Sequence, residues 1–177
     1  MPLRTILRDH TRAQHDVLDA SLDMDALSES KRYADFLCRQ YRARQPIEAY
    51  VESLGRDDMP PLALPRLERD LDALGIALPS LGRRFTLPEE SDPVGLAWAL
   101  AGSHLGNRAM LAGLDNPALP THFLGDERMI AYWKALRPRL NRHVIVPEAR
   151  PAILAATAVF AQFQSAFGLT SQPRKAA

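Results

Sequence analysis

Apolar residues recur every three or four positions along most of this 177-residue chain, the spacing of helices that bury one face. No stretch shows the alternation of an exposed strand, and there is no internal repeat or low-complexity tract. The pattern predicts helices over residues 3–20, 28–54 with a kink or boundary at Pro46, 66–75, 93–114, 126–142 and 147–168. We therefore predict a single all-α domain of seven or eight helices over residues 1–170, followed by a disordered polar tail over 171–177.

The first predicted helix carries a histidine within its apolar stripe. Leu7, Thr11 and His15 follow one another at intervals of four residues, and Leu18 continues the same face. The neighbouring His10 falls on another face, where we expect it to be solvated. A histidine on an inward face is either a hydrogen-bonded core residue or a metal ligand, and the pattern alone leaves both open.

Two glycines one turn apart mark the helix predicted over 93–114. The run Gly102-Ser103-His104-Leu105-Gly106 lies in its middle, where each glycine costs about 0.5 to 1 kcal/mol relative to alanine. Glycines at this spacing allow a neighbour to approach the backbone closely. That neighbour is either a packed helix or a flat ligand.

Composition excludes several classes of protein. The net charge is +1, and no basic stripe with interleaved aromatic residues indicates nucleic-acid binding. Cys38 is the only cysteine, which rules out an intrachain disulfide and fits a reducing cytoplasm. No apolar stretch is long enough for a membrane span, so we predict a cytoplasmic protein without membrane contact. Phosphate-loop, Rossmann, zinc and di-iron motifs are also missing from the sequence.

Two of these segments match a known family together. Leu7-Arg8-Asp9-His10-Thr11-Arg12-Ala13-Gln14-His15 resembles the N-terminal signature of haem oxygenases, Leu-Lys/Arg-x-x-Thr-x-x-x-His. The run from Gly102 to Gly106 resembles the Gly-Ser-x-Leu-Gly signature of the bacterial members, in which another glycine usually stands where this chain has Asn107. Ala158-Val159-Phe160 is similar to the family's last helix, so the resemblance spans nearly the whole chain.

The resemblance implies a fold in which haem lies between the first helix and a glycine-kinked distal helix. His15 would bind the iron, with Thr11 from the same signature, and the distal side would be formed by Gly102, Ser103 and Gly106. The implied reaction cleaves haem, both cofactor and substrate, to biliverdin, CO and Fe²⁺. It uses O2 and an electron donor such as ferredoxin or a reductase. The product would serve iron release or supply a bilin to a bacteriophytochrome.

The remaining candidates concern the rim of the haem site. Haem propionates need cations at the open edge, and Arg8 matches a basic position in the family motif. Arg137 is the best-placed arginine of the helix before the last one, with Arg139 and Arg142 as alternatives. Each of these arginines is otherwise explained as a solvated surface residue. Phe160 would pack near the macrocycle, although core packing explains it and Phe163 equally well.

His104 departs from the family pattern. We expect it to be exposed on the side of the helix away from the glycines, but an inward orientation would let it block the distal side. Two further functions stay open: a non-catalytic haem carrier or sensor on the same fold, and a helical interaction module whose glycine face packs a partner helix.

Overall fold

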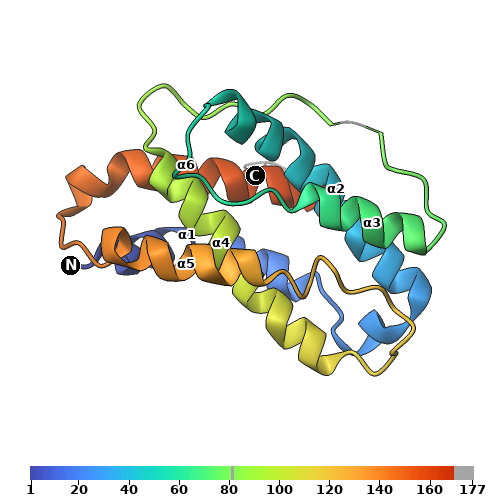
Figure 1. The fold of residues 1–177 in the computed structure, drawn as a ribbon. Helices are drawn as coiled ribbons and strands as arrows, with labels where there is room; N and C mark the ends of the chain where they lie inside the picture. The colour runs from blue at the N-terminus through green and yellow to red at the C-terminus, as the bar shows by residue number, and fades with distance from the viewer. Residues whose placement is uncertain (81, 170–177) are drawn as a thin grey trace, which may run out of the picture.

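The computed structural model describes residues 1–80 and 82–169, and the described chain is helical (Figure 1). The elements are α1 (Leu3–Ala20), the short 3-10 helix η1 (Asp25–Ser28), α2 (Ser30–Ser53), α3 (Leu64–Ala73), α4 (Pro93–Gly113), α5 (Glu127–Leu140) and α6 (Val146–Ala166). The predicted all-α class is confirmed, because the described residues contain no strand beyond one isolated bridge between Pro2 and His143. The predicted tail, 171–177, lies outside the described residues.

The described chain has six α-helices and one short 3-10 helix, so the predicted number of seven or eight is reached only when the 3-10 helix is counted. Pro46 lies inside α2 instead of ending a helix. A proline within a helix has no N–H to give to the carbonyl four residues earlier, here that of Arg42. The Arg42 carbonyl instead accepts a hydrogen bond from Gln162 Nε2 on α6, at 3.5 Å. This contact gives the freed carbonyl a partner and α2 continues to Ser53.

Helix α4 is packed between α5 and α6. Gly95 makes the closest of these contacts, because a Cβ atom at this position would lie 1.9 Å from the carbonyl oxygen of Ala152 on α6. Helix α1 packs mainly on α6 and makes a smaller contact with α5. Helices α1 and α4 thus share neighbours without forming a close helix pair themselves, which leaves space between them.

The connection between α4 and α5 is fixed to α3. The buried carboxylate of Asp70 on α3 accepts hydrogen bonds from the backbone N–H groups of His122 and Phe123, at 3.0 and 2.8 Å, and its Oδ1 lies 2.6 Å from His122 Nδ1. These bonds hold Phe123 in the core against α2. The far side of α4 is therefore covered by a connection that the protein holds in place.

Within the described part of the chain, no helix combines the length and hydrophobicity needed to cross a membrane.

Candidate functional site

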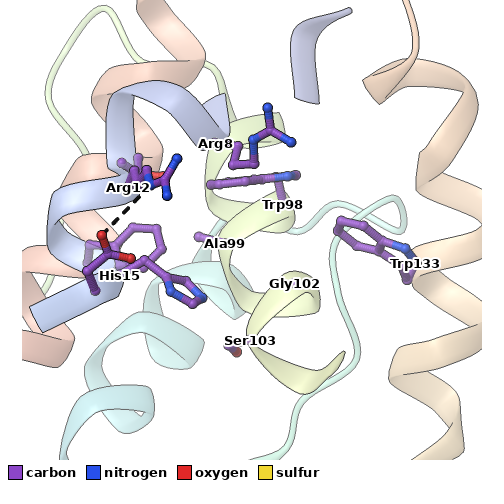
Figure 2. Close-up of a pocket in the computed structure, with 11 residues that line it drawn as sticks. Arg8, Arg12, His15, Trp98, Ala99, Gly102, Ser103 and Trp133 are labelled. Carbon is purple, nitrogen blue, oxygen red and sulfur yellow. Dashed lines mark ion pairs between the residues drawn. The ribbon is translucent and has the colours of Figure 1, made fainter. Parts of the chain in front are cut away.

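A cleft with two lobes lies between α1 and α4. Figure 2 shows the residues that line the larger lobe. The larger lobe has a volume of about 560 Å³ and the smaller lobe about 170 Å³. Both lobes are lined by His15, Ala99, Gly102, Ser103 and Phe160. The larger lobe falls within the range of cavities that hold small-molecule ligands and cofactors.

His15 enters the cleft from α1. Figure 2 shows its ring directed away from α1 towards α4, and the side chain is 56% exposed because the cleft opens to solvent. Its Nδ1 lies 3.0 Å from Oδ2 of Asp19, one turn further along the helix. A carboxylate at Nδ1 orients the imidazole and leaves Nε2 as the available ligand atom, the usual arrangement behind a metal-binding histidine. Sequence reasoning missed Asp19, although its spacing of four residues from His15 was a usable signal.

His15 belongs to no metal-binding cluster in the described part of the chain. Among the residues that the structure describes, no cluster of three histidine, cysteine, aspartate or glutamate side chains could hold a metal ion. A single imidazole suits a metal whose other ligands come from a macrocycle.

The opposite wall of the cleft is formed by α4, where the backbone of Gly102 and Gly106 lies beside the side chains of Trp98, Ala99 and Ser103. We call this side of the cleft the glycine wall. A Cβ atom at Gly106 would have no atom within 4 Å, and one at Gly102 would meet only the ring of Trp133, at 3.7 Å. Gly95 on the same helix lies against α6 and has no room for a side chain. Helix packing therefore explains Gly95 but neither of the other two glycines, whose open sides face the cleft. Helix α4 runs without interruption through both of them.

Ser103 lies next to Gly102, and two hydrogen bonds fix its side chain. Its hydroxyl donates to the carbonyl of Leu100 at 2.8 Å and accepts from Nη2 of Arg44 at 3.0 Å. Arg44 comes from α2 and is buried to 1% exposure. Sequence reasoning missed this arginine, because nothing in the pattern of α2 separates a buried arginine from its solvated neighbours.

The comparisons with known proteins come from structure alone. No family model matches the chain, and no curated protein matches it either. A solved structure of the NO- and CO-bound haem oxygenase from Neisseria meningitidis superposes with a TM-score of 0.69. The match covers 99% of this chain and 98% of that one, at 21% sequence identity. This chain has the haem oxygenase fold.

Within the haem oxygenase fold, the structure brings most of the predicted rim together. Arg8 and Thr11 line the larger lobe, and Phe160 lines both lobes with its ring centroid 6.2 Å from that of His15. Thr11 is buried and its hydroxyl donates to the Leu7 carbonyl at 2.9 Å, so its hydrogen is already bound to the helix.

The cationic edge of the cleft differs from the expected one. Arg137 is exposed and lines neither lobe, although Trp133 one turn earlier lines the larger lobe. Arg12, which sequence reasoning passed over, lines the larger lobe together with Arg8. Both of these arginines extend from α1, so the cations of this edge belong to the helix that carries His15 (Figure 2).

His104 lies away from the cleft, as expected, but the prediction that it is exposed was wrong. Its side chain is 1% exposed, 3.0 Å from Asn107 Nδ2 and edge-on to the ring of Phe123. The fixed connection between α4 and α5 covers this face of the helix. Burial, helped by the positive charge of Arg44, lowers the pKa of His104 to about 4. His104 is therefore a neutral core residue and lines neither lobe.

Proposed function

We propose that this protein is a haem oxygenase, which binds haem between α1 and α4 and cleaves it with O2 and reducing equivalents to biliverdin, CO and Fe²⁺. The observation that carries the proposal is the pair of walls that face each other across the cleft. His15 presents an imidazole on one side, and α4 presents the backbone of Gly102 on the other, next to the small residues Ala99 and Ser103, within a haem oxygenase fold. The space and the ligand atom both suit a flat macrocycle with a metal at its centre.

His15 is the proposed iron ligand, through Nε2, with Asp19 setting the orientation of its ring. Bound haem would supply both the metal that activates O2 and the ring that is oxidised. Gly102 and Gly106 leave room on the distal side for a small ligand, because a side chain at either position would extend into the cleft. Phe160 and the other apolar residues of the lining exclude water from the ring faces.

Ser103 contributes an acceptor to the distal side. Its proton is held by the Leu100 carbonyl, so the hydroxyl can present only a lone pair to the cleft. A water bound there would donate one hydrogen to Ser103 and keep its second hydrogen for an oxygen ligand. This water would donate a hydrogen bond to the oxygen ligand without the help of an acid–base side chain.

Arg8 and Arg12 are the proposed partners of the haem propionates, because both reach the same edge of the larger lobe. Arg137 is a weaker candidate, since it lies outside the lining. We further propose that ferredoxin or a reductase supplies the electrons and that a bacteriophytochrome accepts the bilin. The proposed location of the protein is the cytoplasm.

Haem titration tests the binding step. The wild-type protein should form a one-to-one complex with an intense absorption band near the blue edge of the visible spectrum, and His15→Ala should lose the band or shift it. Added imidazole should restore the band in that variant by taking the vacated position. His10→Ala is a matched control, because His10 is on the same helix and lines neither lobe. Haem binding that is equal in His15→Ala and wild type would contradict the proposed site.

Turnover tests the reaction. The haem complex, supplied with O2 and either ascorbate or a ferredoxin system, should lose its haem absorption and yield a bilin, CO and Fe²⁺ in equal amounts. A stable complex that returns haem unchanged would refute the catalytic proposal and favour the carrier or sensor. The interaction module has less support, because the open sides of Gly102 and Gly106 face a cleft that also contains His15.

A further inference from the structure

Arg44 is a fully buried cation directly behind the glycine wall. Its Nη2 donates to Ser103 Oγ at 3.0 Å, and its Nε donates to Oε1 of Gln40 at 3.4 Å. The guanidinium carbon lies 5.2 Å from the ring centroid of Phe123 and 5.7 Å from that of Phe163. Ser103, Gln40 and Phe163 all line the smaller lobe of the cleft. The cation is thus separated from the cleft by one layer of side chains.

The charge of Arg44 is only partly balanced. Glu48 Oε1 lies 3.7 Å from Nη1 of Arg44, and neither atom has a hydrogen-bond partner. The other carboxylate oxygen of Glu48 is occupied by the backbone N–H groups of Ala63 and Leu64, at 2.9 and 3.0 Å. A guanidinium keeps its proton even when buried. Since a buried ion pair seldom adds stability over an apolar pair of the same volume, this one needs another explanation.

Arg44 also decides which way the Ser103 hydroxyl points. A guanidinium can only donate hydrogen bonds, so the serine oxygen must accept from it. The serine proton then goes to the Leu100 carbonyl, where a 2.8 Å hydrogen bond is present. The cleft therefore meets an oriented hydroxyl dipole with a positive charge immediately behind it.

We infer that Arg44 is a positioning residue that gives the glycine wall a positive potential, so that this wall favours small anions and ligands with a partly negative outer atom. The inference rests on the proposed haem site, because the ligand concerned would be held opposite His15. Arg44 is fully buried, and a buried charge is screened less by salt and solvent than an exposed one.

Azide and CO are the probes, one anionic and one neutral. In the ferric haem complex, Arg44→Met should weaken azide binding about tenfold, the usual effect of losing one charge-assisted interaction. CO binding to the ferrous complex should change far less, because CO carries no net charge. Arg44→Lys should restore most of the azide affinity. Arg42→Met is the matched control, because Arg42 is an exposed arginine on the same helix that lines neither lobe.

Glu48→Gln tests the same inference in the opposite direction, because it should strengthen azide binding. Removing this negative charge leaves Arg44 unbalanced, so azide affinity should rise, and a glutamine oxygen can still accept from the backbone N–H groups of α3. This variant decides the question if Arg44→Met does not fold. A purely structural Arg44 would change azide and CO binding in parallel, or neither.

The two proposals fail differently. A wild-type protein without a His15-dependent haem spectrum would refute the haem site, and the role of Arg44 with it. Arg44→Met with that spectrum intact and unchanged azide affinity would overturn the role of Arg44 alone, as would unchanged azide affinity in Glu48→Gln.

Discussion

Gly102→Ala should make the ligand-free protein more stable and the haem complex weaker. Alanine at an interior helix position is favoured over glycine by about 0.5 to 1 kcal/mol. The added Cβ would lie 3.7 Å from the Trp133 ring, which is ordinary van der Waals contact, so packing should not cancel this gain. A methyl group forced against a bound ring costs about 1 to 3 kcal/mol, which corresponds to a loss of roughly 5- to 150-fold in haem affinity.

Two measurements on the same variant separate these effects. Urea unfolding of the ligand-free protein, followed by circular dichroism, gives the change in unfolding free energy, and haem titration gives the change in affinity. Gly113→Ala is the control, because it is also on α4, has no atom within 4 Å of its added Cβ and lines neither lobe. It should leave haem affinity unchanged. If Gly102→Ala binds haem as tightly as the wild type, the bare backbone is not a ligand surface.

Gly95→Ala provides the contrast. Its Cβ would lie 1.9 Å from the Ala152 carbonyl, so α4 and α6 would have to separate. We expect the unfolding free energy of this variant, measured without ligand, to be lower by at least about 1 to 3 kcal/mol. Stability that is unaffected would contradict the close α4–α6 contact.

Three further variants test the surroundings of the cleft. Asp19→Asn should keep the haem complex but weaken it about 10- to 100-fold, because the carboxylate no longer orients His15; an unchanged titration would dismiss that role. Arg12→Ala should weaken haem binding in a salt-dependent way and more than Arg137→Ala does, and the reverse order would restore Arg137 as the propionate partner. His104 binds its proton at about pH 4 in the folded state and near 6.5 when unfolded, so the unfolding free energy should fall as the pH drops from 6.5 to 4. That decrease, up to about 3 kcal/mol, should be smaller in His104→Gln. If the unfolding free energy changes equally with pH in both proteins, other groups cause the decrease.

Local patterns were sufficient for the parts of the fold that depend on one segment. The first helix was predicted over residues 3–20 and is observed as Leu3–Ala20, because its apolar spacing and its preceding proline both act within the segment. The opposition of His15 to the Gly102 wall was also predicted, but through the family resemblance and not through periodicity. Periodicity gives the face of a helix without naming the helix that will stand opposite.

The wrong or missed residues depend on contacts between distant segments. Pro46 was expected to kink a helix or to end one; it ends none, and the Gln162 side chain that gives the freed Arg42 carbonyl a partner belongs to α6. His104 was expected in solvent, and the connection that buries it is fixed by Asp70 on α3. Arg44 is buried because Phe123 and residues of α6 enclose it. In each case the deciding neighbour is remote in sequence, so no pattern within the helix could reveal it.

The chain has two tryptophans, Trp98 on α4 and Trp133 on α5, and both line the larger lobe. A haem held there would accept excitation energy from both indoles, so the intrinsic fluorescence of the protein should be almost completely quenched on binding. The same emission would then be a poor measure of unfolding, because release of the ligand and loss of the fold would both brighten it. It would, however, report occupancy of the cleft in real time, without any introduced label.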